Sequence, residues 1–156
     1  MEVIDNTGMS NVTIPMQSVI DSYATYAIIT IPSGIYKIGG TINLKEGQTL
    51  IANNDVIIIG IGTNLLVNAT YKTTIQGIEF QNCSTAINLT GHSAFNVVNC
   101  RFTNNIVYSA INLYNCLGKC NITGSYFNNI LKYGILIDNN SSDITIEGNC
   151  FDNEFV

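Results

Sequence analysis

Short runs in which hydrophobic and polar residues alternate, separated by Gly and Asn, fill most of the chain. Alternation with a period of two is the pattern of a β-strand with one buried face. From residue 74 onward a nine-residue unit recurs, with an apolar residue in second place, Phe in seventh and Asn in ninth. The four copies are 74–82, 96–104, 121–129 and 145–153. The pattern predicts one strand-forming motif that recurs along the chain.

The step between units indicates the kind of repeat. The four Phe lie 22, 25 and 24 residues apart, and a second apolar strip recurs between them at 86–89, 110–113 and 134–137. Steps of this size fit either a leucine-rich repeat or one coil of a parallel β-helix. The units are rich in Ile, Val, Phe and Asn and have neither a Leu frame nor a segment of period 3.6, which favours the β-helix.

In a parallel β-helix each strand pairs with the equivalent strand of the next coil, about 4.8 Å away, so equivalent residues form columns. Alternation then predicts which columns point inward. We expect three of them: Ile75, Val97, Ile122 and Ile146; the core stack Phe80, Phe102, Phe127 and Phe151; and Ile87, Ile111 and Ile135, with Leu89, Leu113 and Ile137 two residues on.

Asn recurs two residues after each Phe, at Asn82, Asn104, Asn129 and Asn153. Stacked amides can hydrogen-bond along the axis of a repeat structure, so we predict an asparagine ladder at these four positions. The alternative is that Asn acts as an ordinary turn former at each corner. The constant offset from Phe favours the ladder.

The first half of the chain has the same pattern in a less regular form. Strands are predicted between residues 26 and 59, interrupted by Pro-Ser-Gly and Gly-Gly. Before them, Met16, Val19, Ile20 and Tyr23 lie near helical spacing, which predicts a short amphipathic helix within 14–24 that covers one end of the core. We therefore expect one domain, with an N-terminal cap segment over 1–25 and a β-helix over 26–156.

The segments 17–21, 31–38 and 47–51 resemble the first coils of the pectate-lyase-like right-handed β-helix superfamily, and the Asn-Ile-Thr-x-x-x-x-Phe-x-Asn units resemble its generic repeat. The resemblance implies an all-β fold, a single-stranded right-handed parallel β-helix of about five to six coils with a short N-terminal capping helix. The superfamily includes polysaccharide lyases and hydrolases, viral tailspikes and surface adhesins, so the fold alone does not assign a function. The Ile- and Asn-rich, Lys- and Arg-poor style most resembles adhesin-like surface proteins of methanogenic archaea.

Composition limits the partners that the protein can have. Charged residues make up 11% of the 156 residues and the net charge is −5, whereas nucleic acids and anionic membranes bind clustered cations. The longest aliphatic stretch, 56–61, is far shorter than a bilayer span. We therefore expect neither nucleic-acid binding nor membrane insertion. The low cation content with 22 Asn fits an extracellular or cell-surface location.

Cleavage of a polysaccharide on a β-helix wall needs outward carboxylates, as an acid and base pair or as calcium ligands. The pattern places Glu79 beside Arg101 on adjacent coils, which we interpret as a surface ion pair. Asp138, Asp143 and Asp152 are predicted to lie near one another without a cationic partner. We therefore expect no catalytic residues and no enzymatic activity.

His92 and Cys116 each lie three residues after a Leu of the repeat and are predicted to stack at the same turn, with Cys120 four residues on, where two thiolates and an imidazole could bind a soft metal. Their spacing matches no known metal motif and a fourth ligand is missing, so we predict no metal and no cofactor. Cys100 and Cys120 are expected to point inward as small apolar residues and Cys150 to point outward.

We predict a non-catalytic cell-surface module, either adhesin-like or structural. The alternative is a glycan-binding or polysaccharide-cleaving domain of the tailspike type, because exposed Tyr rings stack on sugars. The candidate glycan contacts are Tyr71, Tyr108, Tyr114 and Tyr133.

The fourth unit stops before a second strand follows it, so we expect the C-terminal end of the helix to contact other copies of the protein or further β-helix repeats. Phe155 and Val156 would lie in that contact.

Overall fold

The structure is a computed structural model that describes residues 4–62, 65–91, 94–138 and 140–152. Within these ranges it contains one helix, α1 (Thr13–Ser22), and 14 strands. The strands are β1 (Thr7–Asn11), β2 (Ile28–Thr30), β3 (Gly34–Ile38), β4 (Ile42–Asn43), β5 (Thr49–Gly60), β6 (Leu65–Ala69), β7 (Thr74–Thr90), β8 (Asn96–Val98), β9 (Arg101–Tyr114), β10 (Leu117–Thr123), β11 (Tyr126–Asn128), β12 (Tyr133–Asp138), β13 (Ser142–Glu147) and β14 (Cys150–Asp152).

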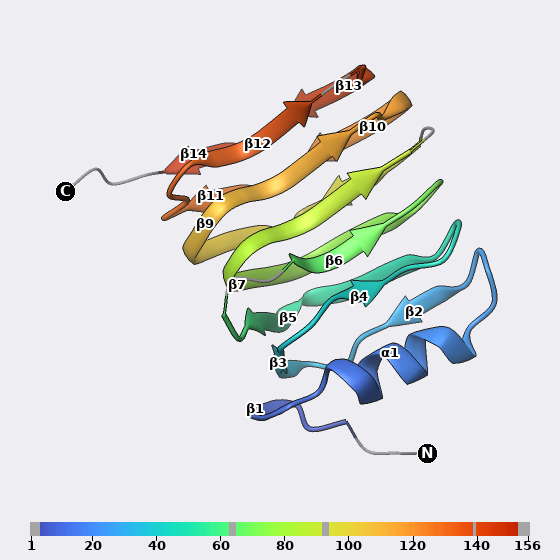
Figure 1. Ribbon diagram of the computed structural model, residues 1–156, viewed down its shortest axis with the longest axis vertical. Helices are drawn as coiled ribbons and strands as arrows, with labels where there is room; N and C mark the ends of the chain where they lie inside the picture. The colour runs from blue at the N-terminus through green and yellow to red at the C-terminus, as the bar shows by residue number, and fades with distance from the viewer. Residues whose placement is uncertain (1–3, 63–64, 92–93, 139, 153–156) are drawn as a thin grey trace.

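The strands wind into a parallel β-helix of about six turns, stacked along the long axis of the molecule (Figure 1). Every strand pairing among the described residues is parallel. The coil has three faces. The first contains β2, β8, β10 and β13, the second β1, β3, β11 and β14, and the third β4, β6 and β12, while β5, β7 and β9 bend around corners and serve two or three faces. The predicted fold class is confirmed.

The strand register confirms the predicted columns, and their members are buried in the earlier turns, whereas Ile137 and Ile146 in the last turn are 46% and 41% exposed. Ile75 pairs with Val97 and Val97 with Ile122, and the column ends at Ile146. The third column likewise runs from Ile87 through Ile111 to Ile135, with Leu89, Leu113 and Ile137 alongside. The less regular first half extends the first column to Ile29 and Leu50.

The four Phe form one stack of nearly parallel rings. Ring centroids lie 5.6, 4.9 and 4.5 Å apart from Phe80 to Phe102, Phe127 and Phe151. Phe80, Phe102 and Phe127 are buried, but Phe151 is 57% exposed and so differs from the prediction of a wholly buried column. The reason is its position in the last turn, where no further coil among the described residues covers the ring.

The three corners of the coil depend on left-handed backbone. Each corner carries a column of residues with φ between 51° and 72°, a region that L-residues other than Asn and Asp rarely adopt. The three columns are Tyr26, Gly47, Lys72 and Ala94; Gly77, Asn99, Gly124 and Gly148; and Asn82, Asn104 and Asn129. A side chain on Gly77 would meet the backbone carbonyl of Ala52 on the previous coil, so this corner also requires close approach.

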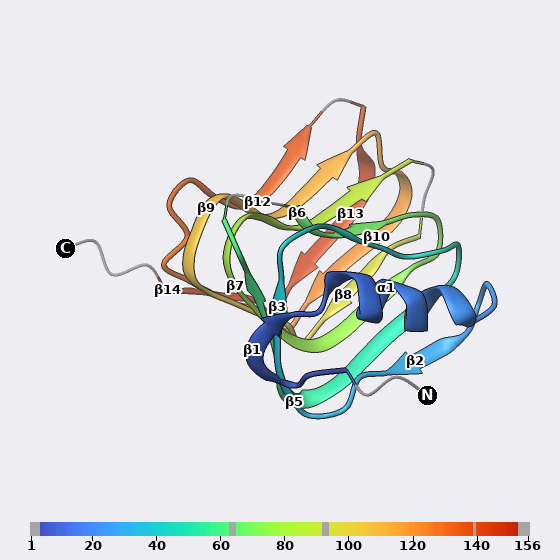
Figure 2. The same ribbon diagram turned by 60° about the horizontal axis from the view of Figure 1, so that its bottom comes forward.

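Helix α1 covers the N-terminal end, as predicted, and lies across the opening of the first coil (Figure 2). Met16 and Ile20 are buried against the core. The Gln17 side chain bonds to β4 as a neighbouring strand would, because its Oε1 accepts from the Asn43 N–H at 2.7 Å and its Nε2 donates to the Asn43 carbonyl at 3.0 Å. The helix thus satisfies the strand edge that it covers.

We expect Phe102→Ala to lower the free energy of unfolding by about 3 to 5 kcal/mol, because the buried ring leaves a cavity between two others. Phe151→Ala serves as the matched control and should cost about 1 kcal/mol, because its ring is more than half exposed. Urea denaturation of both variants measures the difference. Equal losses would contradict this account of the Phe stack.

We expect Ala94→Gly to raise the free energy of unfolding by about 1 kcal/mol, because Ala94 holds a φ of 69° that costs an L-residue energy and glycine none. Ala24→Gly is the control. Ala24 is not among the residues with positive φ, so this change should lower stability by about 0.5 kcal/mol through backbone entropy. Thermal unfolding of the two variants should therefore shift in opposite directions.

Candidate functional site

A column of outward side chains crosses the face that holds the Phe stack. Strand pairing aligns Glu79, Arg101, Tyr126 and Cys150, each one residue before a Phe. The Glu79 Oε2 and Arg101 Nε atoms lie 3.5 Å apart, so the predicted ion pair between adjacent coils is present. The column thus lines up an acidic, a basic, a phenolic and a thiol side chain on one face.

The Glu79 carboxylate is engaged on both oxygens. Its Oε1 accepts hydrogen bonds from the Gln81 amide at 2.7 Å and the Thr103 hydroxyl at 2.6 Å, while Oε2 faces Arg101. Gln81 and Thr103 were not predicted as partners of Glu79, although the sequence holds a signal: Gln81 lies two residues after Glu79 and Thr103 two after Arg101, so each points to the same side of its strand. A half-buried carboxylate with these partners is held as an ordered anion.

The chain of contacts continues toward the last turn. The Arg101 guanidinium lies over the Tyr126 ring, 4.8 Å from its centroid, and the Tyr126 hydroxyl donates to Asp152 Oδ2 at 2.9 Å. The hydrogen bond to the Asp152 carboxylate raises the pKa of Tyr126, because ionisation would place two negative charges together. Four side chains on successive coils are therefore linked in a chain: Glu79 pairs with Arg101, Arg101 lies over Tyr126, and Tyr126 bonds to Asp152.

A hollow of about 510 Å³ lies beside the ion pair. It is lined by Asn54, Glu79, Asn99, Cys100, Arg101, Gly124 and Tyr126. Amide, guanidinium and phenol groups offer both donors and acceptors, so the hollow suits a polar, uncharged ligand such as a sugar better than an apolar one.

The three aspartates singled out in the sequence do not form a site. Asp152 is bonded to Tyr126 on the face with the Phe stack, whereas Asp138 ends β12 and Asp143 belongs to β13, on the other two faces. Within the part of the chain that the structure describes, no three His, Cys, Asp or Glu side chains gather where they could hold a metal ion.

Of the candidate soft-metal ligands, His92 lies outside the described residues. Cys116 and Cys120 are both buried, and the Cys116 thiol donates to the Leu89 carbonyl at 3.1 Å. The inward position predicted for Cys120 is therefore confirmed.

The positions predicted for the other cysteines can also be compared with the structure. Cys83 and Cys100 are buried, and burial raises the pKa of each thiol to about 12, so both stay protonated at neutral pH. Cys150 is exposed. The inward position of Cys100 and the outward position of Cys150 are confirmed, and Cys150 is the accessible thiol of the described residues.

Two of the four candidate tyrosines come together. The rings of Tyr108 and Tyr133 meet edge to face, with centroids 5.6 Å apart, and the Lys132 ammonium lies 4.8 and 5.0 Å from the two centroids. Both rings are partly exposed. Lys132 was missed, although it directly precedes Tyr133. We call Tyr108, Lys132 and Tyr133 the aromatic cluster.

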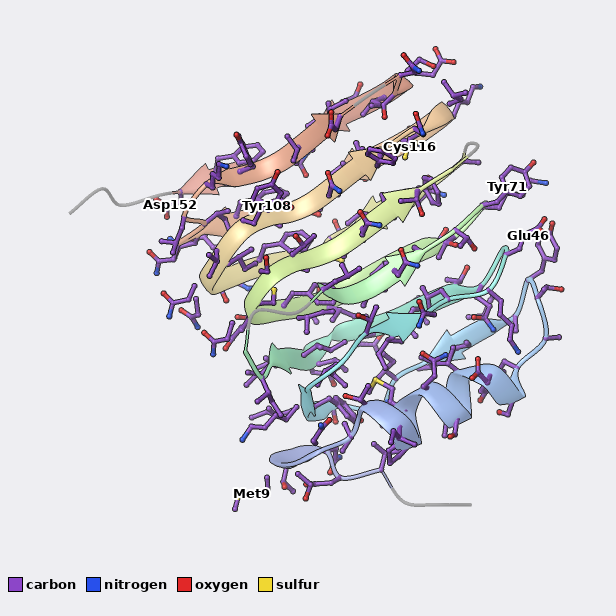
Figure 3. The ribbon with its side chains drawn as sticks, viewed as in Figure 1. Met9, Glu46, Tyr71, Tyr108, Cys116 and Asp152 are labelled. Atoms are coloured by element: carbon purple, nitrogen blue, oxygen red, sulfur yellow. The ribbon has the colours of Figure 1, made fainter. Side chains whose placement is uncertain are left out.

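The other two tyrosines lie elsewhere. Tyr71 is found at a turn near Glu46, across the sheet from Tyr108 (Figure 3), where the Lys72 ammonium lies 4.8 Å from its ring centroid. Tyr114 ends β9 with its side chain exposed. The four tyrosines therefore do not form one row that a single sugar chain could follow.

An asparagine ladder exists, but it runs along a different column from the one predicted. On the third face, each Asn amide nitrogen donates to the Asn Oδ1 of the previous coil, at 3.3, 3.1 and 2.8 Å. The members are Asn43, Asn68, Asn88 and Asn112. The signal was present in the sequence, because Ile-Asn-Leu recurs at 42–44, 87–89 and 111–113.

The predicted ladder residues have another role. Asn82, Asn104 and Asn129 are exposed, have φ of 51° to 54°, and share no side-chain hydrogen bond with one another. Asn153 lies outside the described residues, as do the predicted assembly residues Phe155 and Val156. The three described asparagines are turn formers, because Asn tolerates the left-handed backbone that the corner requires.

The observed ladder ends at an unsatisfied atom. Asn112 Oδ1 is buried and has no hydrogen-bond partner. The equivalent position on the next coil is Leu136, which cannot donate.

Comparison with known proteins supports the fold and leaves the family open. No family model and no curated protein matches the sequence. A crystal structure from Parabacteroides merdae ATCC 43184, of a protein provisionally assigned as a glycosyl hydrolase, matches with a TM-score of 0.56 at 14% identity and covers 97% of this chain and 92% of that chain. At this identity the likeness concerns the fold alone. No helix in the described residues is long and apolar enough to cross a membrane.

We expect Leu136→Asn to extend the ladder by one coil and raise the free energy of unfolding by about 1 kcal/mol, because the new amide can donate to Asn112 Oδ1. Leu136→Ser is the control, since its shorter side chain does not reach the neighbouring amide. Chemical denaturation compares them. A Leu136→Asn variant no more stable than Leu136→Ser would contradict the ladder account.

Proposed function

We propose that the protein is a non-catalytic β-helix module with a structural or adhesive role at the cell surface. The observation that carries the proposal is the engagement of Glu79, whose two oxygens are occupied by Gln81, Thr103 and Arg101. A general acid or base needs a free oxygen aimed at the substrate. The carboxylate of Glu79 is instead bonded to neighbouring side chains of the same face.

The spacing of the carboxylates also favours a non-catalytic role. Glycoside cleavage needs two carboxyl groups about 5 to 10 Å apart across the substrate. Glu79 and the β14 strand of Asp152 are separated by three strand spacings, roughly 14 Å. A lyase would need a free cationic or neutral base, and Arg101 is held between Glu79 and Tyr126.

The surface location is supported by the character of the outer faces. The ladder face presents amides bonded to one another, and charged residues make up only 11% of the chain. Such a wall offers little electrostatic attraction to nucleic acids. It suits a rigid spacer or contact surface outside the cell.

Glycan binding is the second candidate function. Two observations favour it: the aromatic cluster presents two partly exposed rings with a fixed ammonium group, and the similar solved structure carries a provisional glycosyl hydrolase assignment. Tyr rings stack on the apolar faces of sugars, and the ammonium can donate to hydroxyls. The polar hollow beside Arg101 could bind a further sugar unit.

A panel of polysaccharides, assayed for new reducing ends and for unsaturated products, tests the absence of catalysis. We expect no product above a buffer control. Product formation that is lost in Glu79→Gln, in Asp138→Asn or in Asp152→Asn would establish an enzyme and contradict the proposal.

Glycan binding is tested with the same panel by calorimetry or an array. If a glycan binds at the aromatic cluster, Tyr108→Ala and Tyr133→Ala should each weaken binding about five- to tenfold. Tyr23→Ala is the matched control, because Tyr23 is comparably exposed and lies at the N-terminal cap. An equal loss of glycan affinity in all three variants would show that the glycan does not bind at the aromatic cluster.

A further inference from the structure

A cavity of about 450 Å³ lies between helix α1 and the first coils of the β-helix. Its lining includes core side chains that are at most 3% exposed, those of Ile29, Tyr36 and Leu50. Residues of α1 line the cavity from the other side, among them Met16 and Ile20. The cavity is therefore continuous with the hydrophobic core, at the end of the core that the helix covers.

Hydrogen bonds hold α1 in place beside this cavity. Gln17 bonds to both backbone groups of Asn43 on β4. Near the C-terminal end of the helix, the side-chain nitrogen of the fully buried Gln48 lies 3.3 to 3.4 Å from three carbonyl oxygens, those of Ile20, Tyr23 and Ala24. The Lys45 ammonium also donates to the Tyr23 carbonyl, at 3.1 Å. The helix cannot shift to close the cavity without breaking these bonds, so the cavity is preformed.

The lining of the cavity is apolar and uncharged. None of the lining residues that the structure describes carries a charge, and most of them are aliphatic. Two of the polar side chains are bonded within the protein, because the Tyr36 hydroxyl donates to the Pro32 carbonyl at 2.7 Å and the Ser22 hydroxyl to the Val19 carbonyl at 2.6 Å. A polar ligand would lose hydrogen bonds to water that this lining does not replace, whereas an apolar ligand would gain contacts.

The extent of the lining along α1 indicates the shape of an apolar ligand. The lining runs from Met16 to Tyr23, about 10 Å at the rise of an α-helix, and residues 29–32 line the cavity as well. An extended alkyl chain of roughly eight carbons spans that length. Tyr23 and Thr30 line the cavity but are exposed, so they mark its mouth.

We propose that this cavity binds the alkyl chain of a free single-chain amphiphile, with the polar head group in solvent beside Tyr23 and Thr30. The inference goes beyond the proposed function and does not depend on it. Because the lining offers apolar contacts and no charge, burial of the chain supplies the binding energy. Affinity should therefore follow the length of the chain.

Calorimetric titration of the whole chain with straight-chain hexanol, octanol and decanol tests the inference. We expect saturable binding of one molecule, with an affinity that rises about fourfold for each added CH₂ group. The rise should stop at roughly eight carbons, where the alkyl chain reaches the mouth of the cavity.

Two substitutions on α1 locate the binding site. Val19 lines the cavity, so Val19→Trp should fill it and abolish octanol binding. Ile14→Trp is the matched control, because Ile14 lies on the same helix, is 79% exposed and is not part of the lining, so this variant should bind octanol as the wild type does. Circular dichroism establishes that both variants fold. If Val19→Trp does not fold, the chain-length series on the wild type still decides the question.

Four outcomes would overturn the inference. The first three are a wild type without saturable binding, an affinity that does not change with chain length, and a folded Val19→Trp variant that binds octanol as the wild type does. The fourth is sedimentation of the protein with phosphatidylcholine vesicles, which would assign the cavity to the chains of a membrane instead of a free amphiphile. None of these outcomes changes the polysaccharide assays, so a failure of this inference is distinguishable from a failure of the proposed function.

Discussion

The structure depends on one constraint, the in-register parallel pairing of each coil with the next. Because equivalent residues lie one strand spacing apart, a residue type that stacks well on itself can serve at every coil. The Phe stack and the asparagine ladder are two such solutions, one for the core and one for the wall. The same pairing means that a change of residue type at one coil leaves the residue on the adjacent coil without its partner. Asn112 Oδ1 is such a case, because the residue at the equivalent position on the next coil is Leu136, which cannot donate a hydrogen bond.

The corners of the coil also restrict the sequence, because they need residues that adopt left-handed backbone. Each coil must turn three times within 22 to 25 residues, and columns of left-handed residues lie at three corners of the coil. Gly and Asn fill most of these positions because they adopt that backbone at little cost. The high Asn content therefore has two separate physical origins, left-handed corners and a bonded ladder, and the two involve different residues.

The surfaces on which a function could reside are the outer faces and the two ends of the β-helix. The polar column from Glu79 to Asp152 is bonded within itself, which favours a wall over a catalytic centre. The aromatic cluster presents two partly exposed rings beside an ammonium group, and it is the surface on which we propose that a sugar would bind. The ends are unequal, because α1 closes the first coil while the last turn leaves Phe151 and its neighbours in solvent.

The sequence by itself determined the repeat, the inward columns, the capping helix and the ion pair of Glu79 with Arg101, because strand alternation and the coil period are local properties that fix which residues stack. Tertiary structure alone decided how side chains at the corners and on the walls meet. Asn82 and Asn88 both recur at fixed positions of the repeat, so recurrence alone did not distinguish the residue that holds a left-handed turn from the one that bonds along the axis. Tyr108 and Tyr133 meet while Tyr71 lies across the sheet, because turn lengths and bulges shift the register between strands by amounts that composition does not encode.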